Sequence, residues 1–299
     1  MSIRLMEMGP EHLAGVLDLI AEAELCLHPD LGWLRYRTLE DPTCLPGLLL
    51  VAQEEQTTTG FCLACVRGER GVIKAFAVSA RWRRQGIGTA LLDEIESRLR
   101  AHKVGQIVVE GVAPNYLLPG VDLHHTDAMA FLMQRGYETD RVARVDMAVD
   151  LPRADLETTE DEARLAREGI VLRRAQGSEI GIAAEFTLTG FSATWQREVA
   201  DAARFDVPPL FVALDGSRVI AFAAYDVTGW GRFGPTGTDP AYRRRGIGGA
   251  LLRMCLRAMR DRGDRKAEIG WAGPLGFYAR AVDARISRAY WVFRKGVEG

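Results

Sequence analysis

Two short stretches of the chain combine arginine and glycine at a spacing that suits the binding of an anion. Residues 81–92 read RWRRQGIGTALL and residues 241–252 read AYRRRGIGGALL, and eight of the twelve positions are identical. Each stretch follows a segment expected to be extended and leads into apolar residues at helical spacing. The first N–H groups of a helix lack internal partners and lie at its positive end, so each stretch is predicted to bind phosphate.

The residue types within these turns have separate roles in that prediction. Gly86 and Gly246 have no Cβ, which permits positive φ and close approach of a phosphate to the backbone. Arg84 and Arg244 can pair with phosphate oxygens through two hydrogen bonds at once. The alternative is a surface turn with solvated arginines, and the repetition of the motif in equivalent contexts argues against it. Neither turn carries the glycine-lysine string of nucleotide triphosphate loops or the third glycine of the dinucleotide fingerprint.

The shared pattern Arg-x-x-Gly-x-Gly, at 83–88 and 243–248, resembles motif A of the GNAT superfamily of N-acetyltransferases. The resemblance extends over nearly the whole chain as two repeats, an organisation similar to that of tandem GNAT proteins such as mycothiol synthase. It implies that acetyl-CoA is the acyl donor, with no metal, and that the acceptor is a small-molecule primary amine or a protein amine. The positions that it implicates in acetyl-CoA binding are Phe76, Ala77, Val78, Arg83, Arg84, Gln85, Gly86, Ile87, Gly88 and Thr89 in the first copy, and Thr236, Gly237, Thr238, Arg243, Arg244, Arg245, Gly246, Ile247, Gly248 and Gly249 in the second.

The length of the chain fits two domains, because 299 residues is about twice a typical domain of roughly 150. We expect an α/β fold with mixed α+β sheets, built as two tandem GNAT-like domains. The expected N-terminal domain is 1–149 and the C-terminal domain is 170–299. Between them, 150–169 is expected to be a linker with one short helix, because Thr158 and Thr159 precede acidic residues suited to a helix N-terminus.

The hydrophobic pattern predicts the same order of elements in both halves. Each phosphate turn is expected to lie between a strand and a helix. The predicted strands of the first half are 3–8, 47–53, 60–67, 72–78, 106–112 and 142–149, and the predicted helix after the fifth strand is 126–135. Those of the second half are 170–174, 210–214, 219–227, 232–238, 267–271 and 286–293, with helices within 178–203 and at 275–282. Pro235 is expected at an edge or in a distorted strand pairing.

The resemblance also implies a tyrosine that protonates the departing CoA thiolate, on the helix after the fifth strand. A neutral tyrosine suits that role because its reference pKa is near 10. Tyr278 stands at this position in the second copy, whereas Leu132 stands there in the first and cannot donate a proton. We therefore expect catalysis in the C-terminal domain with Tyr278 as general acid. The alternative for Tyr278 is an ordinary core aromatic residue.

Candidates for other roles in catalysis are weaker. Glu110 and Glu268 lie on the predicted fifth strands but are not equivalent, and each is expected to be a solvated strand residue rather than a base. Some family members work without the tyrosine, so catalysis in the first domain stays open. The insertion at 115–125 has no counterpart in the second copy and could shape an acceptor pocket. Tyr116, His124 and His125 are its candidate residues, with simple loop structure as the alternative.

Composition and charge exclude several classes of protein. The chain has no apolar run long enough for a membrane span and no signal-peptide pattern, so a cytoplasmic monomer or homodimer is expected. Residues 170–299 carry 20 basic and 13 acidic residues. Nucleic acid is nevertheless not expected as a partner, because no stacking or recognition-helix motif accompanies the arginines.

The remaining aromatic and cysteine residues leave two questions open. Aromatic residues of the second half could line an acceptor site but are usually core; they are Phe191, Trp195, Trp230 and Trp271. The pair Cys62 and Cys65 is expected to be buried on opposite faces of a strand, without zinc. The acceptor stays undefined, and a CoA-binding sensor or partner-binding protein without turnover remains the alternative function.

Overall fold

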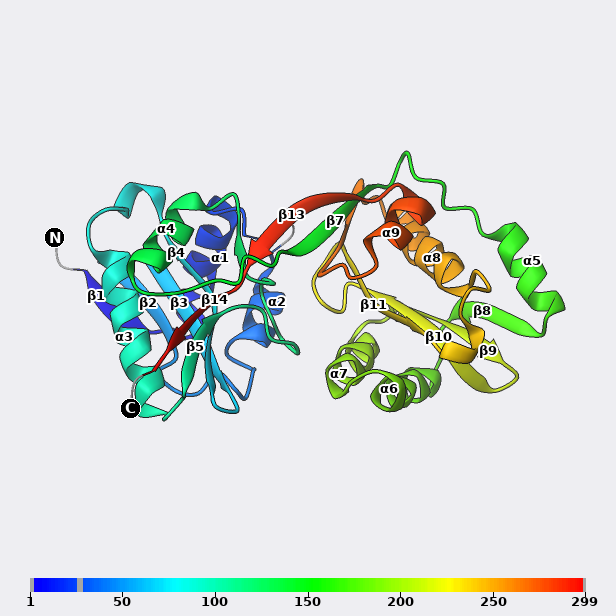
Figure 1. Cartoon of the computed structure of the whole chain (residues 1–299), viewed down its shortest axis with the longest axis horizontal. Coiled ribbons are helices and arrows are strands. Elements are labelled where there is room, and N and C mark those ends of the chain that lie inside the picture. Colours follow the sequence, from blue (N-terminus) through cyan, green and yellow to red (C-terminus); the bar gives the residue numbers. More distant parts are fainter. Residues whose placement is uncertain (1–2, 26–28, 298–299) are drawn as a thin grey trace. The chain divides into compact units, whose positions relative to one another are not determined.

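The computed structural model describes residues 3–25 and 29–297 and divides into two compact units (Figure 1). Unit 1 comprises Met1–Arg144 together with Arg288–Gly299, and unit 2 comprises Val145–Ser287. The chain therefore passes from one unit to the other twice. These boundaries differ from the expected ones at 149 and 170, and the segment 150–169 belongs to unit 2. Its predicted short helix is present as α5 (Thr159–Arg167), with three acidic residues in the first turn.

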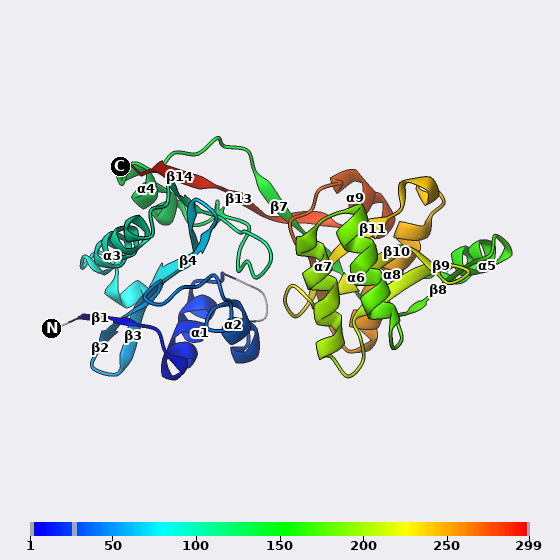
Figure 2. The ribbon, with the colours of Figure 1, turned by 90° about the horizontal axis from the view of Figure 1, so that it is seen from below.

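Unit 1 is a mixed sheet with helices on both faces (Figure 2). The strands of this sheet are β1 (Arg4–Glu7), β2 (Leu49–Glu54), β3 (Thr57–Arg67), β4 (Arg70–Val78), β5 (Gln106–Val109) and β14 (Phe293–Gly296). The short strand β6 (Val121–Asp122) pairs instead with β13 (Arg285–Trp291) in the second sheet. Its helices are α1 (Leu13–Glu22), α2 (Leu31–Arg37), α3 (Ile87–Ala101) and α4 (Thr126–Gln134). One apolar core lies between the sheet and α3 and α4, and a second lies on the opposite face under α1 and α2.

The predicted helix after the first phosphate turn forms as α3 because its apolar residues share one face. Leu91, Leu92, Ile95 and Leu99 are all buried in the core under this helix. Burial of one such side chain stabilises a fold by about 1.5–3 kcal/mol. This packing fixes the N-terminus of α3, and with it the phosphate turn, at the end of β4.

The sheet of unit 1 opens where β4 and β5 part. These two strands pair in parallel from Arg70 with Gln106 to Ile73 with Val109, and β4 then continues to Val78. At the same point β4 bulges, because Ile73 and Ala75 lie opposite consecutive residues of β3 and Lys74 is the extra residue. Such bulges re-aim a strand. The last five residues of β4 thereby diverge from β5, and their edge is directed towards the site described below.

Unit 2 repeats this architecture. Its strands are β7 (Arg144–Asp150), β8 (Ile170–Arg174), β9 (Leu210–Asp215), β10 (Arg218–Tyr225), β11 (Arg232–Thr238), β12 (Lys266–Ile269) and β13 (Arg285–Trp291), of which β7 starts and β13 ends in unit 1. Its helices, besides α5, are α6 (Glu179–Gly190), α7 (Ala193–Ala200), α8 (Ile247–Asp261) and α9 (Leu275–Val282). Helices α8 and α9 pack on one face of the sheet and α6 and α7 on the other (Figure 1). Within residues 3–25 and 29–297, no helix is long and apolar enough to cross a membrane.

The two sequence copies exchange their last strands. Strand β7, which follows α4 of the first copy, pairs with β12 in unit 2, and β14, which follows the second copy, pairs with β5 in unit 1. Phe293 of β14 is fully buried in the core under α3. The predicted strand 142–149 is thus present as β7 in the sheet of unit 2. The predicted strand 286–293 divides into β13, which lies beside β7 in that sheet, and β14, which completes the sheet of unit 1.

Candidate functional site

The two phosphate turns have nearly the same backbone. Arg84 and Arg244 have φ of +63° and +62°, and Gly86 and Gly246 have φ of +83° and +80°. In each copy, the first arginine of the motif donates from Nε to the carbonyl at the end of the preceding strand, at 3.1 and 3.2 Å. Alternating left-handed residues turn successive N–H groups towards one point and form a concave anion site. Both turns therefore have the backbone of a phosphate site.

A cavity of about 570 Å³ lies in unit 1 and joins the first turn to the free edge of β4. The expected acetyl-CoA residues that line it are Phe76, Ala77, Val78, Arg83, Arg84, Gly86, Gly88 and Thr89. The other two expected residues do not line the cavity. Gln85 is exposed and donates from its side-chain amide to the Arg81 carbonyl, and Ile87, the first residue of α3, is buried. Eight of the ten positions thus surround one space large enough for an extended ligand.

The space beside the first turn is open around its glycines. A Cβ built on Gly86 would meet nothing within 4 Å, and one on Gly88 would have only ordinary contacts with Val78 and Phe131. Arg83 is held by an ion pair with Asp127 at 3.0 Å, whereas the exposed Arg84 lines the cavity. The turn therefore offers its backbone N–H groups and a guanidinium to an anion in the cavity.

The insertion in the first copy forms the opposite wall of the cavity. Five residues of the insertion line the cavity: Leu118, Gly120, Val121, Asp122 and His125. Of the three candidates in this segment, only His125 lines the cavity. The side chain of His124 is mostly exposed and lies 2.9 Å from Asp122, while Tyr116 is buried and accepts a hydrogen bond from Arg37 at its carbonyl.

Arg288 is a cavity residue that the sequence did not indicate. It belongs to β13, at the end of the second copy, and reaches unit 1 only because the last strands are exchanged. Its guanidinium donates to the carbonyls of Glu24 and Leu25 after α1, at 2.6 and 3.2 Å, and lies 3.6 Å from Asp122. Asp122 is itself buried. To predict this pairing from the sequence, one would have to know which strands pair, and these strands are far apart in the sequence.

The two glutamates expected to be solvated are in fact buried, which corrects that expectation. Glu110 lines the cavity, and its two carboxylate oxygens accept from Arg70 and Arg144, both at 2.8 Å. Glu268 accepts from Arg232 Nε at 2.8 Å in the interior of unit 2. Burial of a carboxylate is unfavourable unless it is paired, and the arginines provide the pairing. Both oxygens of Glu110 are thus committed to holding the end of β5.

Tyr278 lies in the core of unit 2. It is 6 % exposed, and its ring makes edge contacts with Phe233 and Phe277 at centroid distances of 6.2 and 5.1 Å. Burial raises the pKa of Tyr278 to about 12, so the hydroxyl is neutral at physiological pH. Leu132, its counterpart in unit 1, is fully buried under α3 and α4.

Helix α5 covers the second phosphate turn. Arg164 donates from Nη2 to the carbonyl of Arg245 at 3.0 Å, and this nitrogen lies 2.7 Å from the position of a Cβ on Gly246. Glu168 pairs with Arg245, and Asp161 pairs with Arg253 on α8. Glu168 therefore neutralises Arg245 of the second turn, whereas in the first turn the arginine paired with an acid is Arg83, whose partner is Asp127 of α4.

Aromatic side chains also occupy the space on one side of β11, the strand before the second turn. Strands β10 and β11 lose register where Ala223 pairs with Thr236 and Tyr225 pairs with Phe233, so Pro235 lies in a bulge, as predicted. Phe191 and Trp195 stack at 5.3 Å and, partly buried, pack against a core cluster on the α6 and α7 face. Of the other two aromatic candidates, Trp271 is 37 % exposed, and Trp230 is 43 % exposed and lies under the Arg262 guanidinium at 3.7 Å.

The comparisons with known proteins agree on one family. A family model described as the acetyltransferase (GNAT) family matches residues 16–136 and 182–280. Among solved structures, a tandem GNAT protein from the clavulanic acid biosynthesis pathway is 16% identical with a TM-score of 0.71, covering 100% of this chain and 99% of that one. A GCN5-related N-acetyltransferase from Sphaerobacter thermophilus is 19% identical with a TM-score of 0.69, covering 99% and 96%.

One similar structure is a much longer protein. A GCN5-related glucosamine N-acetyltransferase region of a fungal multi-domain GH3 β-N-acetylglucosaminidase is 21% identical with a TM-score of 0.75. The match covers 98% of the present chain and 38% of the fungal chain. No curated protein matches. At these identities the solved structures show a shared fold, and the family model shows the family.

Proposed function

Because the chain belongs to the acetyltransferase (GNAT) family, we propose that it is an N-acetyltransferase that binds acetyl-CoA in the cavity of unit 1 and transfers the acetyl group to a primary amine. One observation carries the choice of unit 1: its cavity brings the free edge of β4 and the first phosphate turn into a single space. This placement differs from the sequence-based expectation, which favoured unit 2 because of Tyr278.

The residues of unit 1 fit an acetyl-CoA molecule in two places. The N–H groups of the first turn and the Arg84 side chain face the cavity and suit the pyrophosphate. The backbone of Phe76–Val78, beyond the point where β4 leaves β5, suits the amide groups of pantetheine. Acetyl-CoA supplies the activated thioester. The protein orients it, and the wall formed by residues 118–125 positions the amine.

The second unit retains the phosphate turn but offers less space for acetyl-CoA. Arg245 of this turn pairs with Glu168 at the end of α5, Arg253 of α8 pairs with Asp161, and Phe191 packs against Gly237, the counterpart of cavity residue Ala77. An incoming pyrophosphate would have to compete with carboxylates already held in place. We therefore assign unit 2 a supporting role, while the second sequence copy supplies β14 and Arg288 to unit 1.

A matched pair of substitutions tests the assignment. Gly88 and Gly248 occupy the first turn of α3 and α8, and a Cβ at either has only ordinary contacts. Aspartate suits the first turn of a helix, so both variants should fold, but it places a carboxylate where phosphate would bind. In calorimetric titration with acetyl-CoA, Gly88→Asp should weaken binding at least tenfold, which is about 1.4 kcal/mol. Gly248→Asp should change it less than twofold.

Two controls complete this experiment. Gly88→Ala separates the effect of bulk from that of charge and should retain most of the affinity. Circular dichroism should show the same helical content for all three variants. If Gly248→Asp abolishes binding while Gly88→Asp retains it, acetyl-CoA binds in unit 2 and the assignment is wrong.

The alternative is a CoA-binding protein without turnover, and Leu132 at the family's tyrosine position in unit 1 favours it. Release of CoA thiol from acetyl-CoA, measured with a panel of primary amines, amino acids and peptides, separates the two. Amine-dependent thiol release that Gly88→Asp removes supports the enzyme. Tight binding with no release above the rate of hydrolysis for any amine supports the binding protein.

A further inference from the structure

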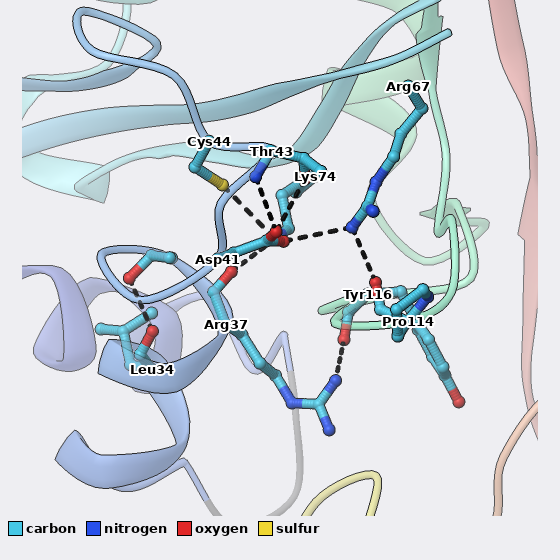
Figure 3. A network of polar contacts seen from close by, with 10 residues as sticks. Leu34, Arg37, Asp41, Thr43, Cys44, Arg67, Lys74, Pro114 and Tyr116 are labelled. Carbon is cyan, nitrogen blue, oxygen red and sulfur yellow. Dashed lines mark hydrogen bonds and ion pairs between the residues drawn. The ribbon is translucent and has the colours of Figure 1, made fainter. Parts of the chain in front are cut away.

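A buried group of charged residues lies together with Cys44 next to the bulge of β4 (Figure 3). The side chain of Lys74 donates from Nζ to Asp41 at 2.8 Å and to the carbonyl of Arg37. Arg67 donates to the same oxygen of Asp41 at 3.2 Å. Lys74 and Asp41 are almost fully buried, with side chains 2% and 1% exposed. The proposed acetyl transfer uses none of these side chains.

Two cations therefore share one carboxylate in this group. A buried positive charge without a negative partner is unfavourable, so the group favours a second anion nearby. Cysteine sulfur is the group that the surroundings offer: Cys44 Sγ lies 3.6 Å from Lys74 Nζ (Figure 3). Thiolates form next to lysine and arginine because these charges stabilise them.

Cys44 has a second cysteine beside it. The N–H of Val66 donates to the carbonyl of Thr43 at 3.0 Å, which places the loop containing Cys44 alongside the strand residue Cys65. The two side chains pack in one small cluster with Val72 and Val108. Cys65 is buried, whereas Cys44 is only partly buried and connects the pair to solvent.

The chemistry of these thiols differs from that of other buried cysteines. The neighbouring Cys44 thiol, with the charges of Lys74 and Arg67, outweighs burial and lowers the pKa of Cys65 to about 6. Burial raises the pKa of both Cys62 and Cys255 above its ordinary value. A thiol with a lowered pKa thus lies beside a second cysteine, which is the arrangement of an oxidation-sensitive pair.

We propose that Cys44 and Cys65 are a modification site, at which a hydroperoxide oxidises the two thiols to a disulfide. The Cys65 sulfur attacks the peroxide, the O–O bond breaks, and one oxygen leaves as water, or as alcohol from an organic hydroperoxide. The Cys44 sulfur then displaces water from the sulfenic acid on Cys65 and forms the S–S bond. Overall, two thiols are oxidised, one hydroperoxide is reduced, and both thiol protons leave in the products.

Mass spectrometry of the full-length protein tests the proposal, with hydrogen peroxide as the probe. Cys26→Ser serves as the background, because it removes the cysteine outside the described residues. After peroxide treatment and alkylation in denaturant, cleavage after Glu40, Glu54 and Glu69 places Cys44 on a different peptide from Cys62 and Cys65. The linked peptides, 2 Da lighter than their sum, should rise at least tenfold over the untreated sample and disappear after reduction.

Two variants identify the partner of Cys44. Cys62→Ala is the matched control and should still form the link, whereas Cys65→Ala should reduce it at least tenfold. In the unsubstituted pair, the rate of oxidation should rise with pH around 6 rather than around the ordinary thiol value of about 8.5. Cys44 and Cys65 that stay fully alkylated after peroxide, or a link that survives in Cys65→Ala, would overturn the proposal.

Discussion

The ring of Phe191 lies directly against the backbone of Gly237. A Cβ on Gly237 would be 2.4 Å from Phe191 Cζ and 2.9 Å from an atom of the Phe222 ring, both closer than real Cβ contacts. Gly237 lies on β11, the strand before the second phosphate turn. Glycine at this position therefore serves to pack an aromatic cluster in unit 2.

Substitution of Gly237 by alanine should destabilise the protein. The added methyl has to displace packed rings, and overpacking of this kind costs about 1–3 kcal/mol. Gly181 in α6 is the matched control, because a Cβ there meets nothing within 4 Å. Gly181→Ala should stabilise by about 0.5–1 kcal/mol. Urea unfolding measures both, and equal stability of the two variants would contradict the close packing of Phe191.

Phe293→Ala should destabilise unit 1 although Phe293 is near the end of the chain. Its side chain is fully buried in the core under α3, and Phe293 pairs with Val109 of β5. Loss of a buried phenylalanine costs about 3–5 kcal/mol. Ile286 on β13 is 57% exposed, so Ile286→Ala should cost less than about 0.5 kcal/mol. Urea unfolding compares the two, and a neutral Phe293→Ala would show that β14 does not complete the sheet.

Asp41 should make stability depend on pH in the acid range. Burial alone raises the pKa of Asp41, but the charge and hydrogen bond of Lys74 and the hydrogen bonds of Thr43 outweigh it, so the pKa lies below 3.8. The stabilisation is therefore fully present above about pH 4 and is lost as the pH falls through the lowered value.

The variant Asp41→Asn tests this dependence. At pH 7 it should cost about 3–5 kcal/mol, because it leaves buried Lys74 without its carboxylate. The difference in free energy of unfolding between the variant and the parent should shrink as the pH falls from 4 to 2, as measured by urea unfolding at each pH. Asp140→Asn, at an exposed position, is the control. A deficit that stays constant down to pH 2 would show that Asp41 does not carry the effect.

Tyr278→Phe should leave acetyl transfer unchanged if the reaction takes place in unit 1. The ring packs against Phe233 and Phe277, and phenylalanine retains these contacts. The rate of CoA thiol release at saturating acetyl-CoA should stay within twofold of the parent. A loss of tenfold or more in turnover, with acetyl-CoA affinity and stability retained, would instead place the general acid in unit 2, as the sequence predicts.

Sequence periodicity predicted the elements that form from local pattern. The phosphate turns, the helices that follow them and the strand 232–238 lie where the glycines and the apolar spacing indicated. Gly86 and Gly246 do adopt the positive φ that their lack of a Cβ permits. These features depend on neighbouring residues, and a single sequence contains that information.

Contacts between distant residues could not be predicted in this way. The pairing of Arg164 with the carbonyl of Arg245 spans 81 residues, and the approach of Arg288 to Asp122 spans more than 160. The expectation of solvated glutamates failed for the same reason, because the arginines that allow Glu110 to be buried come from β4 and β7. Tertiary pairing decides whether such a charge is buried or solvated.

The exchange of β7 and β14 also sets the order of events during synthesis. Domains usually fold as they emerge from the ribosome, N-terminal part first. Here the sheet of unit 1 keeps an open edge at β5 until translation reaches Phe293–Gly296, after all of unit 2 has been made. An open edge can pair with other chains. Unit 1 therefore spends most of the synthesis time incomplete, and it closes only when the second copy delivers its final strand.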